Sequence, residues 1–162
     1  MSIQIIEADY RNGEHAQALI ALLDTYARDP MGGGQPLGGV VRDNLVSELA
    51  ARPQAFSVLA FADGTAVGLA NCFEGFSTFA CRPLINIHDL VVLPAYRGQG
   101  VAHAILGHVE TLARARGCCK LTLEVLQGNQ AAQGLYRKAG YAGYQLDAEH
   151  GNALFWQKRL AD

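Results

Sequence analysis

The sequence predicts a single α/β (α+β) domain in which helices and strands share one core. Its length of 162 residues suits one core, since two domains would each be small. Half of the residues are apolar and only 17% are charged, which excludes an intrinsically disordered chain. Helical and strand-like periodicities alternate along the chain, with no internal repeat and no polar linker. We therefore expect residues 1–162 to fold as one domain.

The first half of the chain predicts three strands and two helices. Asp63-Gly64 separates two of the strands and predicts a tight hairpin, because glycine tolerates positive φ. Five glycines between Gly32 and Gly39 predict an irregular segment between the two helices. The expected strands are 2–7, 55–62 and 66–73, and the expected helices are 14–27 and 43–51.

The second half predicts two further helices and four strands. Pro94 ends one strand, Gly117 ends the helix that begins near Val101, and Asn129 can cap the last helix. The expected strands are Leu84–Leu93, Lys120–Leu126, Tyr141–Leu146 and Ala153–Arg159, and the last helix runs to Ala139.

Charge and hydropathy exclude several classes of protein. The formal net charge is −2 and there is no run of Lys or Arg, so we expect no binding to nucleic acid. The longest apolar run, Ala18–Leu23, is far shorter than a membrane span, so we expect no membrane partner. We see no export signal and no CxxC pair among the four cysteines, which predicts reduced thiols in the cytoplasm.

The most informative segment is Leu90–Ala102, with the sequence LVVLPAYRGQGVA. A strand leads into a turn that contains Gly98 and Gly100, and the turn opens a helix. Such a helix start offers free N–H groups and the positive end of the helix dipole, which favour a diphosphate. Arg97 adds a positive charge at the turn.

Two cofactor classes use a turn of this kind. The dinucleotide-binding fingerprint needs a third glycine, where this chain has His103, although Glu124 stands at the distance of its acidic residue. The alternative fits better. Arg97-x-x-Gly100-x-Ala102 and the downstream segment NQAAQGLYRKAGY, from Asn129 to Tyr141, together resemble the two ordered motifs of the GNAT superfamily of N-acetyltransferases.

The resemblance implies a fold and a cofactor site. The fold is a mixed, mostly antiparallel twisted sheet flanked by helices, with a V-shaped splay between the strands Leu84–Leu93 and Lys120–Leu126. Acetyl-CoA lies in that cleft in the family, as the acetyl donor, and no metal is implied. The residues that the resemblance assigns to acetyl-CoA are Leu90, Val91, Val92, Arg97, Gly98, Gln99, Gly100, Val101, Ala102, Asn129 and Tyr136.

The resemblance also assigns two catalytic roles. Tyr136 matches the tyrosine that protonates the departing thiolate, although a tyrosine that only packs on the sheet is the alternative. The segment Phe76–Val92 resembles the polyamine (diamine) acetyltransferase branch, whose glutamate acts through a water as the base. His88 replaces that glutamate and Asp89 is retained. Neutral histidine can accept a proton near neutrality, so His88 is the predicted base, and a structural, partly buried histidine with Asp89 or water as the base is the alternative. Strand alternation separates His88 and Asp89 onto opposite faces unless a bulge intervenes.

We therefore expect an N-acetyltransferase that acetylates a primary amine of a small molecule. A protein or peptide N-acetyltransferase and a non-catalytic acyl-CoA-binding sensor stay open as alternatives. The resemblance further suggests a homodimer. It also suggests that the segment 30–39 is a mobile loop beside the acceptor, because glycines permit closure.

Overall fold

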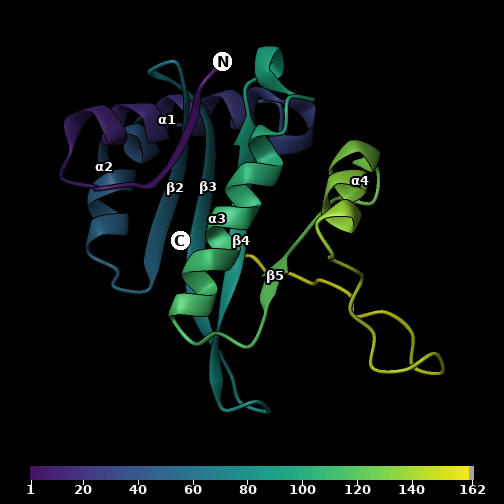
Figure 1. The fold of residues 1–162 in the computed structure, drawn as a ribbon. Coiled ribbons are helices and arrows are strands. Elements are labelled where there is room, and N and C mark those ends of the chain that lie inside the picture. The colour runs from purple at the N-terminus through teal and green to yellow at the C-terminus, as the bar shows by residue number, and fades with distance from the viewer. Residues whose placement is uncertain (161–162) are drawn as a thin grey trace.

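A computed structural model of the protein describes residues 1–160, which form a mixed sheet with helices on both faces (Figure 1). The five strands follow one another in the order β1-β2-β3-β4-β5, antiparallel except for the parallel pair β4 and β5. The predicted fold class is confirmed. The strands are β1 (Ile3–Glu7), β2 (Ala55–Ala62), β3 (Thr65–Ser77), β4 (Arg82–Val92) and β5 (Leu121–Leu123).

Of the four helices, three cover the faces of the sheet and α4 lies to one side of it. One face packs against α1 and α2, and the other face packs against α3 (Figure 1). Short polar side chains begin two of the helices, since Asn12 accepts hydrogen bonds from the first turn of α1 and Asn129 does the same for α4. The helices are α1 (Gly13–Arg28), α2 (Gly39–Ala50), α3 (Val101–Ala115) and α4 (Gln130–Lys138).

The core has two layers, one on each face of the sheet. Leu19 and Leu22 of α1 are buried against Leu59 and Leu69, while Ile105 of α3 is buried on the opposite face. In the described part of the chain, no helix is both long enough and apolar enough to cross a bilayer.

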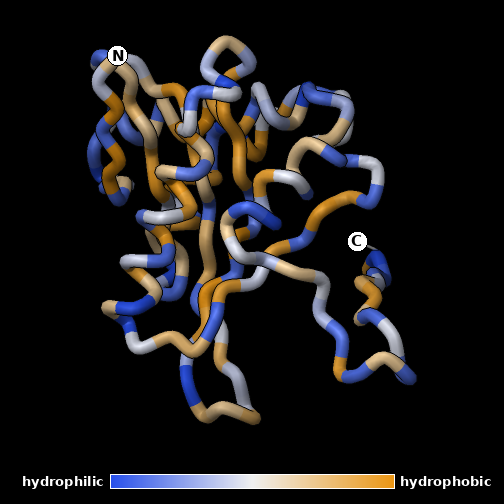
Figure 2. The backbone as a smooth tube through the Cα atoms, turned by 45° about the vertical axis from the view of Figure 1, so that its right-hand side comes forward, coloured by the Kyte–Doolittle hydropathy of each residue, from blue (hydrophilic) through white to orange (hydrophobic). Residues whose placement is uncertain are grey.

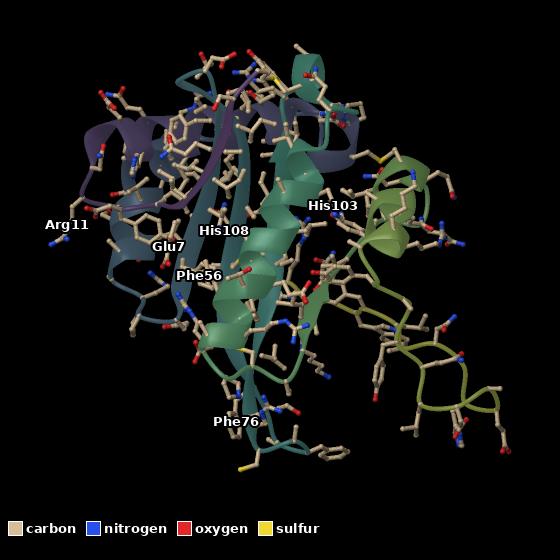
Figure 3. All side chains as sticks on the ribbon, viewed as in Figure 1. Glu7, Arg11, Phe56, Phe76, His103 and His108 are labelled. Carbon is tan, nitrogen blue, oxygen red and sulfur yellow. The ribbon has the colours of Figure 1, made fainter. Side chains whose placement is uncertain are left out.

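The predicted hairpin between β2 and β3 is confirmed. Asp63 and Gly64 both have positive φ, 46° and 84°, which is the backbone that this tight turn requires. The strand that follows extends to Ser77, beyond its expected end, because it pairs with β4 along nearly its whole length. Figure 3 labels Phe76 near the far end of that long hairpin.

The prediction of two strands at the C-terminus is wrong. Residues Tyr141–Leu146 and Ala153–Arg159 make one isolated bridge, between Gln145 and Asn152, and join no sheet. Their alternating apolar residues satisfy the pattern of a strand, but a strand also needs a neighbour and these segments lie outside the body of the fold (Figure 1). For the same reason β5 spans three residues rather than seven: beyond Leu123 it has no partner in β4.

Candidate active site

The strand β4 and the edge strand β5 part where the chain forms its main cleft. β4 pairs with β5 only from Ile85 to Ile87. It then continues to Val92 without a partner on that side, so its outer edge is free over the last residues. A cavity of about 610 Å³ opens there. The end of β4, the start of α3 and one side of α4 form its walls. Figure 3 shows His103 of α3 on the side that faces α4.

The start of α3 forms one end of this cleft. Gly98 and Gly100 have φ of 75° and 84°, and Gly100 is the residue at which the helix begins. A Cβ atom at either position would meet nothing within 4 Å. No side chain within residues 1–160 caps this helix, so its first N–H groups are available to an anion in the cleft.

Arg97 connects the turn to the opposite wall. Its Nε donates to the carbonyl oxygen of Val92 at 3.0 Å, and one terminal nitrogen lies 3.4 Å from a carboxylate oxygen of Asp29. Asp29 follows α1, so this ion pair joins the predicted diphosphate turn to the predicted acceptor side. The side chain of Arg97 is half exposed and its charge faces the cleft region.

The glycine-rich segment after α1 is held by defined bonds. Asp29 accepts the N–H of Met31, and Asp24 accepts the N–H of Leu37. A Cβ on Gly32 would lie 1.9 Å from the carbonyl oxygen of Tyr26, so only glycine fits at that position. Asp29 and Met31 line the cleft. The segment therefore borders the cleft through Met31, and its mobility and its place beside the acceptor stay predictions.

Tyr136 of α4 is partly buried on the cleft wall. Burial raises the pKa of its hydroxyl, and the nearby hydroxyl of Tyr26 raises it further. The hydroxyl therefore stays protonated throughout the neutral range and can donate a proton. Asn129 lines the same wall, and its side-chain oxygen accepts the N–H of Ala132 at 3.1 Å. The predicted capping role of Asn129 is thus confirmed.

A β-bulge places His88 and Asp89 on the same face of the sheet. The pairing of β3 with β4 shifts by one residue between Asn71 and Cys72, which leaves His88 unpaired. The ring of His88 packs edge-on against Phe73, at 5.6 Å between centroids. Both Phe73 and Asn71, which is bonded to Asp89, face the layer of α1 and α2. The bulge removes the alternation that would have separated the two residues.

A chain of hydrogen bonds ends at Asp89. Ser57 and Asn71 are buried polar residues in the middle of the sheet. The hydroxyl of Ser57 donates to Asn71 at 2.7 Å, and the amide of Asn71 donates to Asp89 at 3.0 Å. Because Ser57 uses its only proton toward Asn71, the hydroxyl of Tyr10 is the donor at 2.9 Å. Every donor points toward the carboxylate, which orients it and stabilises its charge.

The structure brings together nearly all residues that the sequence assigns to acetyl-CoA. Each of them lines the cleft except Gln99, whose amide donates to the carbonyl oxygen of Ala95 at 2.9 Å. His88 and Asp89 do not line the cleft itself. The negative charge of Asp89 nevertheless contributes to a raised pKa of Tyr26, after burial, so the carboxylate lies near that wall.

Sequence reasoning missed several lining residues. Most of them lie in or beside the segments Leu90–Ala102 and Asn129–Tyr141, whereas Tyr26 and Asp29 come from a part of the chain without a motif and only the fold brings them to the cleft. Within residues 1–160 no group of three metal-binding side chains is close enough to hold an ion. The lining residues without a predicted role are Tyr26, Asp29, Met31, Tyr96, His103, Gln130, Ala131, Ala132, Gly134, Leu135 and Lys138.

Comparisons with known proteins agree with this arrangement. Streptothricin acetyltransferase of Streptomyces lavendulae is 36% identical over 87 residues, which are 54% of this chain and 44% of that protein. The chain thus matches less than half the length of this curated relative. A probable acetyltransferase of known structure superposes with a TM-score of 0.77 at 23% identity, covering 96% of this chain and 99% of that one.

Aminoglycoside acetyltransferases also share the fold. AAC(6')-Iy in complex with CoA superposes with a TM-score of 0.72 at 20% identity, covering 98% of this chain and 96% of that one. A protein from an uncultured soil metagenomic sample, in complex with sisomicin, has a TM-score of 0.76 at 14% identity, covering 97% of each chain. The family described as Acetyltransferase (GNAT) matches residues 36–141, which is more than half of the sequence. The chain belongs to this acetyltransferase family.

Proposed function

We propose that the protein transfers an acetyl group from acetyl-CoA to an amine of a small molecule. The observation that carries this proposal is the convergence of three features on one cleft. They are the uncapped start of α3 at Gly100, the free edge of β4 up to Val92, and the protonated hydroxyl of Tyr136. The comparisons support the family, and the activity is our inference from the cleft.

The residues present fit acetyl-CoA. Gly98 and Gly100 carry no side chain and the space beside them is open, so a diphosphate can approach the backbone N–H groups closely. Leu90 to Val92 offer a free strand edge to an extended arm. Arg97 and Lys138 supply positive charge on the two walls. Bound acetyl-CoA would supply the thioester carbon that the amine attacks.

Side chains of the protein would donate and accept the protons that the reaction moves. Tyr136 holds a proton near the cleft and would donate it to the leaving sulfur. Asp89, oriented by Asn71, would pair with the ammonium form of an acceptor. His88 stands beside it on the same face and would accept the proton that the amine must lose before attack.

We infer that the acceptor is a cationic small molecule with several amino groups. The named relatives are streptothricin and aminoglycoside acetyltransferases, which support this class. Asp29 and Asp89 put negative charge on the acceptor side, although Arg97 already pairs with Asp29. The polyamine branch suggested by the sequence finds no named counterpart among these relatives, so diamines are one arm of the test.

A panel of amines tests the proposal. Streptothricin, aminoglycosides, diamines and a peptide N-terminus are each incubated with acetyl-CoA, and released CoA is measured with a thiol reagent. Acetylation of a streptothricin or aminoglycoside is the expected result. Turnover only on the peptide would overturn the acceptor class. Tight CoA binding by calorimetry with no turnover on any amine would identify an acyl-CoA-binding sensor instead.

A further inference from the structure

The guanidinium of Arg97 is anchored at one nitrogen and held loosely at another. Its Nε donates to the carbonyl oxygen of Val92 at 3.0 Å, which fixes the side chain against the end of β4. A terminal nitrogen lies 3.4 Å from a carboxylate oxygen of Asp29, which is long for a hydrogen bond between two charged groups. The bond at Nε can therefore persist while the terminal nitrogens change partner.

The two carboxylate oxygens of Asp29 have different partners. One oxygen accepts the N–H of Met31 at 2.9 Å and begins the short helix η1 (Pro30–Gly32). The other oxygen has Arg97 as its one polar partner within residues 1–160. Burial raises the pKa of Tyr26 in the cleft, and the negative charge of Asp29 adds to that rise. The second oxygen of Asp29 would therefore present a free charge to the cleft if Arg97 left it.

This ion pair lies at the surface of the cleft and outside the core. Hydrophobic stretches run along the strands of the sheet in Figure 2, whereas Asp29 and Arg97 follow α1 and β4. Figure 1 shows the end of α1 beside the start of α3. The exposed fractions of the side chains are 28% for Asp29 and 52% for Arg97. An ion pair this open to water contributes little to stability, so exchanging one partner costs little.

A diphosphate at the start of α3 would compete with Asp29 for this guanidinium. Arg97 directly precedes the turn of Gly98 and Gly100, where the first N–H groups of the helix are free. A diphosphate carries more negative charge than one carboxylate, and its oxygens can accept both terminal nitrogens of an arginine at once. The new pair would therefore be stronger than the present contact at 3.4 Å.

We propose that Arg97 exchanges Asp29 for the diphosphate when CoA binds, and that the released carboxylate of Asp29 binds an amino group of the acceptor. This inference rests on the proposed function, because it takes CoA and a cationic amine as the two ligands. Two ion pairs replace one, and no covalent bond changes. Each ligand then strengthens the binding of the other, and Asp29 favours acceptors with an amino group beyond the one that is acetylated.

Calorimetry with CoA alone tests the first half of the exchange. Asp29→Asn keeps an oxygen for the N–H of Met31 but removes the charge that holds Arg97, so CoA affinity should rise about threefold. In an Arg97→Gln background the same substitution should have almost no effect, because no guanidinium remains to be released. Equal tightening in both backgrounds would be a general charge effect and would overturn the exchange. Weaker CoA binding by Asp29→Asn would also overturn it, since the carboxylate would then position Arg97 for the diphosphate.

Titration of CoA in the presence of an amine tests the second half. CoA carries no acetyl group to transfer, so both ligands stay bound. Sisomicin, which is bound in one of the similar structures, is the first amine, and the amine with the highest turnover in the panel replaces it if it does not bind. The amine should strengthen CoA binding about threefold more in the wild-type protein than in Asp29→Asn or in Arg97→Gln. The same factor in all three proteins would contradict the role of Asp29.

Glu48→Gln is the matched control. Glu48 of α2 pairs with Arg52 at 2.7 Å, and this exposed ion pair lies outside the cleft. Its loss should change neither the CoA affinity nor the effect of the amine, and equal changes in Glu48→Gln and Asp29→Asn would contradict a specific exchange. Failure of the proposed function looks different, because the wild-type protein would then bind no CoA or acetylate no amine of the panel. Failure of the exchange alone leaves binding and turnover intact and removes only the differences among the variants.

Discussion

The body of the protein and its C-terminal part are built differently. Every buried residue lies between Leu19 and Ala113, and no residue from 114 to 160 is buried. The cleft nevertheless takes one wall from each part. The α3 turn and β4 belong to the body, while Asn129 and Tyr136 come from α4, a helix without a single buried residue.

Because of this difference, we expect the body and α4 to have different roles in the cleft. The body can hold the diphosphate turn rigidly, because α3 is anchored by Val101, Ile105 and Val109 in the core. The helix that carries Tyr136 has no buried residue, and partly buried side chains such as Leu135 and Tyr136 pack it against the core. Substitutions in the body should therefore act mainly on affinity, and substitutions on α4 should act mainly on turnover.

The largest effect, on CoA affinity, is expected for a substitution in the cleft wall that the body forms. Gly100→Glu should weaken CoA binding at least about 100-fold, because the carboxylate would stand where the diphosphate binds and glutamate is strained at φ 84°. Calorimetry with CoA measures the loss. Gly107→Glu is the control, since Gly107 lies in the same helix with ordinary φ and open space around it. Unchanged affinity in Gly100→Glu would contradict the assignment of the turn.

A substitution in the cleft wall that α4 forms should lower kcat. Tyr136→Phe removes the proton donor and is expected to lower kcat about 100-fold, with CoA affinity within about twofold of wild type. Single-turnover measurements ensure that chemistry is the step observed. Tyr96→Phe, in the same cleft, should retain activity. If the two variants behave alike, Tyr136 only packs.

The sequence predicted the body better than the C-terminal part, for physical reasons. The strands β2 and β4 and the glycine turn follow from local patterns: apolar alternation, Asp63-Gly64, and glycines before a helix. These patterns act over a few residues, so a single sequence reveals them. At the C-terminus the same alternation exists, but the partner strand that would make it a sheet is absent from the described chain.

The arrangement of His88 and Asp89 could not be predicted because it depends on register. The bulge that turns His88 and Asp89 to one face is a one-residue shift in the pairing of β3 with β4. The chain of donors to Asp89 begins at Tyr10 in a loop and crosses two strands. No spacing in the sequence links these positions, and only the assembled sheet brings them into contact.

The chain of hydrogen bonds that ends at Asp89 gives the next prediction. Asp89→Asn should raise the acceptor KM about tenfold or more, because the ammonium loses a charged partner while Asn71 keeps a hydrogen-bond acceptor. CoA affinity should not change. Asp43→Asn, on the exposed side of α2, should alter neither value. An unchanged acceptor KM in Asp89→Asn would exclude the carboxylate from the acceptor site.

A smaller effect is expected at His88. If its ring accepts the proton of the amine, kcat/KM should rise with pH through an inflection that depends on His88, since only the neutral ring can act as base. His88→Ala should lower kcat/KM about tenfold and remove that inflection. The pH dependence that remains would come from ionisation of the amine itself. His103→Ala, on the cofactor side of the cleft, should keep the inflection. A profile unchanged by His88→Ala would make His88 structural.

The smallest effect concerns stability at alkaline pH and compares the two parts within one measurement. Burial raises the pKa of Cys72 in the body to about 12, and burial, aided by Glu110, raises that of Tyr141 beside α4 to about 12. Their ordinary values are 9.0 and 10.0. Between these values and the raised pKa, the folded protein binds more protons than the unfolded chain, so the free energy of unfolding falls as pH rises.

The slope should be at most about 1.4 kcal/mol per pH unit for each group, and less for Tyr141 because it is partly exposed. Urea unfolding at several alkaline pH values measures it. Tyr141→Phe should flatten the slope, while Tyr144→Phe on the exposed C-terminal segment 142–160 should not. If the body and the C-terminal part unfold as one unit, the flattening appears in the single main transition. If they unfold separately, it appears only in the earlier transition, and the packing of α4 is then independent of the core. A free energy of unfolding that rises through this pH range would contradict the burial of both groups.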